Sequence, residues 1–438
     1  MKHVTSKTER DRQVIRAVVR KYGPLSRVEI HELTNLRQGT ISALVRELLE
    51  EGDILEAGPS DNPVGRKQIL LRLNDEHRFI AGVEFDDELV IAAVLDLSAK
   101  IRSVVKEPTV LDRGIEGLTK QLLSCTRRTI SEAGVPAQSL IGVGIADPGL
   151  VNTEDGISVT SSIMDFWNKV PLRKIFEDEL GVPTLVESDT RARAVAERIL
   201  GVGEMVEDMI YVDYGTGIGA GIILDGKLLR GHRWAVGEFG HTHVTENGPA
   251  CRCGSFGCLE AVAGAAALES RIRKALVEGS SSQTLTLAGG DVRKISAWTV
   301  MQAARLGDKI CAAIVEQVGN YLGLGIANLV NLFNPSLIVL DKRLGLAGQA
   351  LLDQIVRIVK REALHHSTED LVIRFGTIGE EAGVLGMGLL LRDRYFEIPA
   401  LMPPRFMIES IPISPQRNVT TAAASPSIKR TFRGLRLS

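Results

Sequence analysis

The stretch GEFGHTHVTENGPACRCGSFGCLE, residues 237–260, places one histidine and three cysteines within a short segment of the chain. The candidate metal ligands are His241, Cys251, Cys253 and Cys258. One imidazole and three thiolates form a tetrahedral set typical of zinc, and they leave no open position for a substrate. The sequence therefore predicts a structural zinc ion that holds this loop. His243 is an alternative to His241 as ligand, and reduced core cysteines are the plain alternative.

The composition around this segment is that of a soluble globular protein. The chain has 438 residues, of which 44% are hydrophobic and 24% charged, with a net charge of −2. At ~150 residues per domain it has room for about three domains, and a mostly disordered chain is excluded. No apolar run reaches the ~20 residues that span a bilayer, and the N-terminus lacks the apolar core of a signal peptide. We expect a cytoplasmic protein without a membrane partner, in which Cys125 and Cys311 are inert core residues.

Three helical patterns in the first 52 residues indicate a DNA-binding head. The first runs from Asp11 to Tyr22, the second opens with a capping box formed by Ser26 and Glu29, and the third runs from about Gln38 to Glu51. Only three residues separate the second helix from the third, which is typical of a helix-turn-helix. We predict a winged helix-turn-helix domain over residues 1–75, with a three-helix protein-binding module as the alternative.

The third helix and a hairpin after it supply the candidate DNA contacts. Recognition helices contact base edges with the residues near their N-terminus. Strands expected at Ile54–Ala57 and Gln68–Leu73 form a wing whose tip approaches the DNA backbone. The predicted DNA-binding residues are Arg37, Gln38, Thr40, Ser42, Arg66 and Lys67. Residues 1–46 hold ten Lys and Arg residues against four acids, an excess that suits a polyanionic partner.

From Phe79 onward, apolar strands alternate with helices. Strands are expected at Ile80–Glu84, Val90–Leu97, Leu140–Ile145, Thr184–Glu187, Met209–Val212 and Leu337–Leu340. Helical patterns include Gly114–Ala133 and Asp308–Leu332. This alternation predicts an α/β architecture with parallel strands. In YVDYGTGIGAGII, residues 211–223, a strand enters a glycine turn that suits either a phosphate or close packing on a neighbouring strand.

Three segments together resemble the ROK family of transcriptional repressors and sugar kinases. They are Gly237–His241, the C-x-C-G-x-x-G-C-x-E run from Cys251 to Glu260, and the turn Gly215–Gly219. The resemblance covers residues 77–395, and the head is similar to that of the repressor branch. It implies a two-lobed, actin-like ATPase fold, as in sugar kinases, with sugar bound between the lobes. We expect a small lobe over 76–188, completed by 384–397, and a large lobe with the zinc loop over 189–383.

The resemblance also implies which residues contact sugar. In the family's motif Glu238, His241 and Glu260 contact sugar hydroxyls, and the same histidine joins the three cysteines on zinc. The family's catalytic Asn-Asp pair falls here on Ser188 and Asp189, so Asp189 occupies the position of the general base. Carboxylates and imidazole suit sugars because they accept hydrogen bonds from vicinal hydroxyls. Ser188 in place of asparagine removes one amide from this set.

Two segments that contact the nucleotide in ROK kinases differ here. The Asp-x-Gly-Gly-Thr turn after the first strand is replaced by four carboxylates, those of Glu84, Asp86, Asp87 and Glu88. Two unit charges ~4 Å apart interact by ~4 kcal/mol at an effective dielectric of about 20, so these acids oppose a bound triphosphate. A glycine pair beside the adenosine is replaced by Asp341-Lys342-Arg343. We therefore predict no kinase activity and no bound ATP, with Asp189 as a ligand contact, although its survival is the best argument for a kinase.

Three further features have two interpretations each. Trp167 lines the cleft or lies in the core, and the segment Ala146–Gly149 is a sugar-side turn or a plain one. The basic tail, residues 398–438, lacks periodicity and is expected to be disordered beyond about residue 408, with an extra DNA-contacting arm as the alternative.

These features lead to one hypothesis with two alternatives. The hypothesis is a sugar-responsive transcriptional regulator of carbohydrate metabolism, a repressor, that binds operator DNA as a homodimer or tetramer and carries structural Zn²⁺. Sugar would change the spacing of the DNA-reading heads by favouring one lobe angle. The alternatives are an ATP-dependent hexose kinase fused to a DNA-binding head, and a regulator whose effector is a protein.

Overall fold

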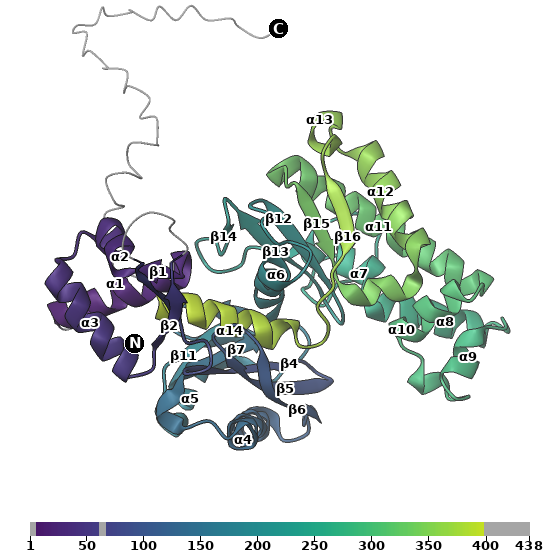
Figure 1. Ribbon diagram of the computed structural model, residues 1–438. Coiled ribbons are helices and arrows are strands. Elements are labelled where there is room, and N and C mark those ends of the chain that lie inside the picture. Colours follow the sequence, from purple (N-terminus) through teal and green to yellow (C-terminus); the bar gives the residue numbers. More distant parts are fainter. Residues whose placement is uncertain (1–5, 61–66, 398–438) are drawn as a thin grey trace, which may run out of the picture.

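The computed structural model of the protein describes residues 6–60 and 67–397. Figure 1 shows a small helical head beside a larger body that is divided into two lobes. Arg66, the expected disordered tail and the alternative DNA-contacting arm lie outside the described residues.

The head has three helices and a small antiparallel sheet of strand order β1-β3-β2. Its elements are α1 (Lys7–Tyr22), β1 (Leu25–Ser26), α2 (Arg27–Thr34), α3 (Gln38–Glu50), β2 (Ile54–Pro59) and β3 (Ile69–Leu73). Helix α1 begins four residues before its expected start because Ser6 accepts a hydrogen bond from the backbone N–H of Glu9 and caps it. The expected capping box of Ser26 and Glu29 opens α2, and Asn35 ends it in the left-handed conformation.

The small lobe is built on a five-stranded sheet of order β11-β7-β4-β5-β6. Its elements are β4 (Phe79–Phe85), β5 (Leu89–Asp96), β6 (Ile101–Pro108), α4 (Gly114–Ala133), β7 (Leu140–Asp147), β8 (Leu150–Asn152), β9 (Ile157–Thr160), β10 (Asn168–Val170), α5 (Leu172–Leu180) and β11 (Thr184–Ser188). Strands β4, β7 and β11 are parallel, but β5 and β6 pair antiparallel with their neighbours. The expectation of parallel strands was therefore wrong for β5, and β6 was not among the expected strands. The short turns before both strands permit only hairpins.

The large lobe repeats this pairing scheme with the order β14-β13-β12-β15-β16. Its elements are α6 (Asp189–Leu200), β12 (Met209–Tyr214), β13 (Ile218–Leu224), β14 (Lys227–Leu228), α7 (Leu259–Ala263), α8 (Ala265–Val277), α9 (Gln283–Leu287), α10 (Ala297–Arg305), α11 (Lys309–Phe333), β15 (Leu337–Leu340), α12 (Gln349–Glu362), α13 (His365–Thr368) and β16 (Val372–Phe375). Strands β12, β15 and β16 are parallel, and β13 and β14 extend the sheet antiparallel. The carboxyl ends of β4, β7, β11, β12 and β15 come together between the lobes, where open α/β sheets bind their ligands.

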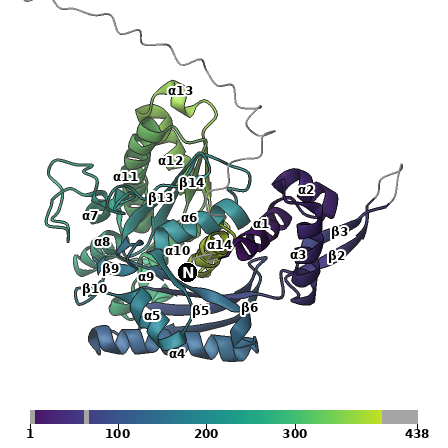
Figure 2. The same ribbon diagram turned by 90° about the vertical axis from the view of Figure 1, so that its left-hand side faces the viewer.

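Two helices cross between the sheets and the head. Helix α14 (Ala382–Tyr395) packs on β4 and β7 of the small lobe and against α6. A Cβ atom on Gly386 would lie 1.8 Å from the carbonyl oxygen of Ala192, so the two helix backbones are almost in contact. The far end of α14 lies beside α1, as Figure 2 shows. The pair α6–α14 therefore connects the space between the lobes to the head.

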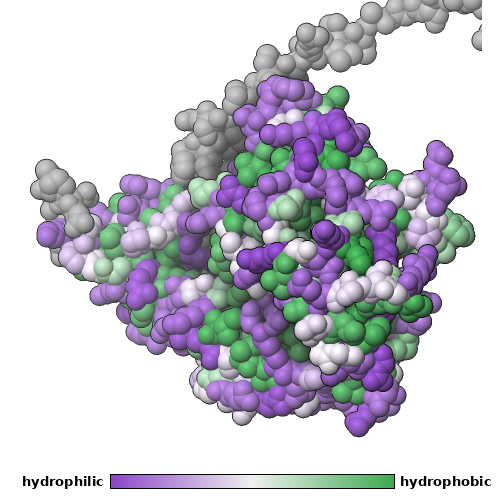
Figure 3. All heavy atoms as spheres, turned by 90° about the vertical axis from the view of Figure 1, so that its right-hand side faces the viewer, coloured by the Kyte–Doolittle hydropathy of each residue, from purple (hydrophilic) through white to green (hydrophobic). Residues whose placement is uncertain are grey.

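Helix α11 is, in the described part of the chain, the helix long and apolar enough to cross a membrane. Of its apolar window, 56% is buried inside the fold, where the helix packs against α12 and α10. Figure 3 shows apolar residues scattered among polar ones on the face of the molecule opposite the head. Burial of α11 agrees with a core helix of the large lobe.

Candidate functional site

A cleft of about 1180 Å³ lies between the two lobes. Its walls come from the turns after β4, β7, β11 and β12 and from the loop before α7. All four predicted sugar contacts, Asp189, Glu238, His241 and Glu260, line it. The fold thus brings together residues that are up to 71 positions apart in sequence.

Glu260 is held by the glycine turn between β12 and β13, and Glu238 lies beside His241. Glu260 Oε2 accepts a hydrogen bond from the backbone N–H of Ile218 at 3.2 Å. A Cβ on Gly217 would lie 3.0 Å from the same oxygen, so the absence of a side chain makes room for Glu260. Glu238 Oε2 lies 4.0 Å from His241 Nε2. These carboxylates offer hydrogen-bond acceptors to a polyhydroxylated ligand.

Asp189 is the first residue of α6 and lies at the base of the cleft. Its Oδ1 accepts a hydrogen bond from the backbone N–H of Thr190 at 2.6 Å. Burial raises the pKa of Asp189 to about 6, because the Arg193 guanidinium offsets only part of the desolvation and Glu84 adds repulsion. A carboxyl group with such a pKa gains or loses its proton near neutral pH, as a general base or a pH-sensitive ligand contact does.

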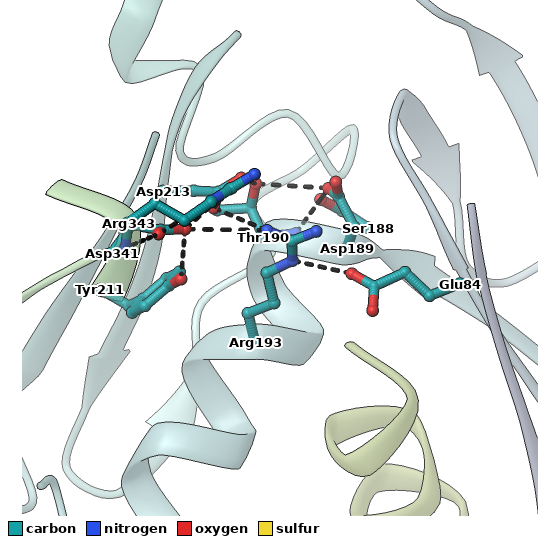
Figure 4. A network of polar contacts seen from close by, with 9 residues as sticks. All are labelled: Glu84, Ser188, Asp189, Thr190, Arg193, Tyr211, Asp213, Asp341 and Arg343. Carbon is teal, nitrogen blue, oxygen red and sulfur yellow. Dashed lines mark hydrogen bonds and ion pairs between the residues drawn. The ribbon is translucent and has the colours of Figure 1, made fainter. Parts of the chain in front are cut away.

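Behind Asp189 lies a buried network of charges that spans both lobes (Figure 4). Arg193 Nε donates to Glu84 Oε1 at 2.8 Å, and its NH1 group donates to Asp213 Oδ1 at 3.2 Å. Asp341 completes the network by accepting hydrogen bonds from Tyr211 and Arg343. Burial raises the pKa of Asp213 to about 7, and Arg193 opposes this shift.

The structure corrects the role expected for Glu84. Its side chain is 4% exposed and pairs with Arg193, so it points away from the cleft and does not face a nucleotide. Three carboxylates of the turn after β4, those of Asp86, Asp87 and Glu88, do line the cleft. Asp87 Oδ1 accepts a hydrogen bond at 3.2 Å from Oγ1 of Thr216, which belongs to the glycine turn on the opposite side of the cleft. The acidic turn thus presents three carboxylates and not four.

Arg343 lies at the side of the cleft expected for an adenine. Its guanidinium carbon stacks 5.1 Å from the centre of the Trp298 ring, and both residues line the cleft. Arg343 Nε and NH2 donate to Asp341 at 3.0 and 2.8 Å. The side chain is therefore held in place from two directions.

The predicted metal ligands converge on one point. The ligand atoms of His241, Cys251, Cys253 and Cys258 all lie within 4.8 Å of one another. Cys251 Sγ is 3.5 Å from His241 Nδ1, and Cys253 Sγ is 3.7 Å from Cys258 Sγ. Tetrahedral zinc with bonds of ~2.3 Å requires separations of roughly 3.8 Å between sulfur atoms, so the donor set fits a metal ion. His243 lies outside the set, with its Nδ1 atom 2.9 Å from the carbonyl oxygen of Phe256.

Of the features left open by the sequence, Trp167 belongs to the core. Its side chain is 0% exposed, and its indole N–H donates to Asp147 Oδ2 at 3.0 Å. Asp147 is also buried, which raises its pKa to about 6, whereas the next two residues, Pro148 and Gly149, line the cleft. Cys125 and Cys311 are buried in α4 and α11, and burial raises the pKa of Cys125 to about 12 and that of Cys311 to about 11. Such thiols are unreactive.

In the head, the predicted DNA contacts lie at the start of α3. Arg37, Gln38 and Ser42 are exposed, and so is Lys67 near the wing, whereas Thr40 is half-buried. The basic excess of the head is smaller than its sequence count. Three of the arginines counted there form ion pairs within the protein: Arg12 with Glu51, Arg16 with Asp53 and Arg20 with Asp393.

Comparison with known proteins adds to this geometry. The model of the ROK family matches residues 80–394. The chain belongs to the ROK family. This ROK chain is 29% identical, over 83% of its length and 90% of the relative's, to a xylose repressor of Caldicellulosiruptor bescii. It is also similar to the crystal structure of a ROK family transcriptional regulator described as a homologue of the Escherichia coli MLC protein. The TM-score is 0.76 and the identity 26%, and the match covers 89% of this chain and 98% of the other.

A kinase of the family is similar over a shorter part. A ROK family glucokinase from Streptomyces griseus, solved with glucose and AMPPNP, matches with a TM-score of 0.65 and 28% identity. The match covers 72% of this ROK chain and 99% of the glucokinase. The two-lobed body is thus shared with both kinds of protein, and the regulator covers more of the chain.

Sequence reasoning missed Arg193 and the network around it. The available signal was an arginine four residues after Asp189 on one helix, a spacing that places both on the same face. Its partners lie in β4, in β12 and directly after β15, and nothing in the sequence brings these strands together.

Proposed function

We propose that this ROK protein is a sugar-responsive transcriptional regulator, a repressor that binds operator DNA through its head and an effector sugar between its lobes. The observation that carries the proposal is one cleft that combines the four predicted sugar contacts with an acidic turn at the position where kinases of the family bind phosphate. The similarity to a xylose repressor and to a ROK regulator over most of the chain supports it.

Under this proposal, the protein does not phosphorylate the sugar that it binds. Asp86, Asp87 and Glu88 would repel a triphosphate, and Arg343 stacked on Trp298 takes up space beside it. Asp189 then serves as a hydrogen-bond acceptor for a sugar hydroxyl. No ATP is expected to bind.

The proposed metal is a structural zinc ion. His241, Cys251, Cys253 and Cys258 would hold it, and it would fix the loop that carries Glu238 and His241 against the cleft. With Nδ1 of His241 on the metal, its Nε2 atom would face Glu238. The metal would thereby hold both side chains, His241 and Glu238, in their positions at the cleft.

Helix α14 offers a route from the cleft to the DNA. At the far end of α14, Asp393 pairs with Arg20 of α1, and the Arg20 guanidinium lies 5.1 Å from the centre of the Phe396 ring. The Gln13 side chain donates to the carbonyl oxygen of Tyr395. A sugar that prefers one lobe angle would move α6 and α14 and thereby reorient the heads of a dimer or tetramer in the cytoplasm.

The test is fluorescence anisotropy of labelled DNA from upstream of the protein's own gene, with a panel of pentoses, hexoses and N-acetylated hexosamines and without ATP. One sugar is expected to change DNA affinity at fixed salt. Tight DNA binding that is indifferent to every sugar would contradict the proposal and favour a protein effector.

A hexose kinase is the second candidate, and Asp189 at the base of the cleft favours it. Sugar-dependent release of ADP that is lost in Asp189→Ala would establish it. Under the proposal, neither the wild type nor Asp189→Ala releases ADP above background.

A further inference from the structure

The guanidinium of Arg193 is at the centre of a buried contact between the two lobes. Its side chain is 13% exposed and projects from α6 (Figure 4). On one side Nε lies 2.8 Å from Glu84 Oε1 of the small lobe. On the other, NH1 lies 3.2 Å from Asp213 Oδ1 and 3.7 Å from Asp341 Oδ2 of the large lobe. One side chain therefore joins both sheets.

Glu84 depends on this contact. Its Oε2 atom is buried without a hydrogen-bond partner in the described part of the chain, and Arg193 is the side chain that donates to its Oε1. Gly383 of α14 lies directly against the carboxyl group, since a Cβ there would fall 2.1 Å from Glu84 Cδ. The carboxylate is enclosed by β4, α6 and α14 and has no room to turn to another donor.

The carboxylates of the large lobe that contact Arg193 have further hydrogen-bond donors. Asp213 also faces Arg343 NH2 at 3.4 Å, and Asp341 is held by Arg343 and Tyr211. Loss of Glu84 would therefore free Arg193 from the small lobe without leaving the acids of the large lobe unpaired.

The same helix carries the sugar contact. Asp189 lies one turn before Arg193 on α6, and the positive charge of Arg193 acts on its carboxyl group. The hydroxyl of Thr190 lies 3.3 Å from both Asp189 Oδ1 and Asp213 Oδ2. The position of α6 thus sets where Asp189 stands relative to the sugar contacts of the large lobe.

Two of the other polar contacts between the lobes lie at the rim of the cleft. Thr216 donates to Asp87 at 3.2 Å, and Arg252 donates to the carbonyl oxygen of Ser162 at 3.5 Å. Polar contacts exposed to solvent contribute little, and charge-assisted hydrogen bonds away from water are stronger.

A second buried contact joins Glu187 at the end of β11 to Arg191 and Arg230 of the large lobe. It lies where β11 continues directly into α6, whereas Arg193 joins α6 to β4. The Arg193 contact is therefore the one that sets the angle between α6 and the central strand of the small-lobe sheet.

We propose that Arg193 is a positioning residue that ties the small lobe to the large lobe through Glu84 and Asp213, and so holds the cleft at the angle that binds sugar. This proposal rests on the proposed function for its sugar but makes a separate statement about the lobes. Without the contact between Arg193 and Glu84, binding of the sugar has to close the cleft. The apparent affinity for the sugar then falls in proportion to the fraction of sugar-free molecules whose cleft is already closed.

The experiment compares Glu84→Gln, Arg193→Lys and the double variant Glu84→Gln/Arg193→Met with the wild type. Glutamine keeps the shape of Glu84 but not its charge, and lysine keeps the charge but cannot span two carboxylates with a rigid fork. The double variant removes both charges and so guards against misfolding caused by a single buried charge. Lys120→Gln is the matched control, since Lys120 forms an exposed ion pair with Glu116 inside α4 of the small lobe and, among the described residues, pairs with no residue of the large lobe.

Two measurements are made: the Kd of the effector sugar and the small-angle X-ray scattering of the sugar-free protein. We expect each of the three variants to bind the sugar about tenfold more weakly and to have a larger radius of gyration, with near-wild-type values for Lys120→Gln. Tenfold is the lower end of the expected change, because hydrogen bonds between charged groups are stronger than those between neutral groups. A purely structural role would lower the melting temperature and leave both measurements unchanged.

Folded variants with wild-type sugar affinity and wild-type scattering would overturn the proposal. If the wild type binds no sugar at all, the proposed function fails, and the scattering comparison still decides whether Arg193 ties the lobes. Unchanged scattering in the three variants would then overturn the tie by itself.

Discussion

Gly386→Ala tests the close packing of α6 on α14. A Cβ atom at this position would lie 1.8 Å from the carbonyl oxygen of Ala192, whereas real Cβ atoms essentially never come within 3.0 Å of such an atom. The helices must therefore move apart by at least the 1.2 Å difference, and neither backbone can rotate out of the way.

Two effects of opposite sign decide the magnitude. Alanine in a helix interior is more stable than glycine by ~0.5–1 kcal/mol, because it restricts the unfolded chain. Overpacking costs ~1–3 kcal/mol, and a backbone clash belongs at the upper end. We expect the free energy of unfolding to fall by about 2 kcal/mol. For a lobe of roughly 150–250 residues, this loss lowers the melting temperature by roughly 4–8 °C.

Thermal unfolding followed by circular dichroism measures this loss. Gly39→Ala is the matched control, because a Cβ at Gly39 in α3 would meet nothing within 4 Å. The control is expected to melt at or slightly above the wild-type temperature. If Gly386→Ala is as stable as the wild type, the two helices are not in backbone contact, and the proposed route from cleft to head through α14 loses its physical basis.

Three other predictions concern the cleft and the metal. Cys253→Ser is expected to lose bound zinc, measured by elemental analysis, together with the sugar response, whereas His243→Ala keeps both because His243 lies outside the ligand set; zinc retained by Cys253→Ser would refute the assignment. Sugar affinity is expected to fall about tenfold between pH 7.5 and pH 5 by calorimetry, because Asp189, with its pKa of about 6, is ionised above that pH and protonated below it; a pH-independent affinity, or the same slope in Asp189→Asn, would contradict this. A sugar phosphate is expected to bind more weakly than the free sugar, because Asp86, Asp87 and Glu88 repel anions. Glu88→Gln is expected to reduce this difference in affinity. Equal affinities for the two ligands would show that these acids do not face the effector.

The elements with strong local signals could be predicted from the sequence. The second helix of the head opens with the predicted capping box, and α4 has the predicted bounds Gly114–Ala133. These elements depend on side chains within a few residues of each other, so the sequence contains all the information that forms them. The ROK family was also recognisable, because the residues that carry the resemblance lie in two short segments, Gly215–Gly219 and Gly237–Glu260.

The errors concern contacts between distant segments. Strand β5 was expected to be parallel to its neighbours, and β6 was not expected at all, because the pairing of these strands depends on the length of the turns before them and on their neighbours in the sheet. Glu84 was expected to face a nucleotide, because the sequence does not show that Arg193, 109 positions later, lies 2.8 Å from it. Trp167 had two open interpretations until Asp147 supplied its buried hydrogen-bond partner.

By itself, the sequence determined the family, the helical head and the set of side chains that suit a metal ion and a sugar. Only the tertiary structure decided that Asp86, Asp87 and Glu88 face the cleft while Glu84 lies behind it, and that three arginines of the head are used in internal ion pairs. The physical reason is that the alternation of apolar and polar residues along a strand, and their spacing along a helix, are local properties of the sequence. Which charge lies beside which other charge is decided by the packing of the two sheets, α6 and α14.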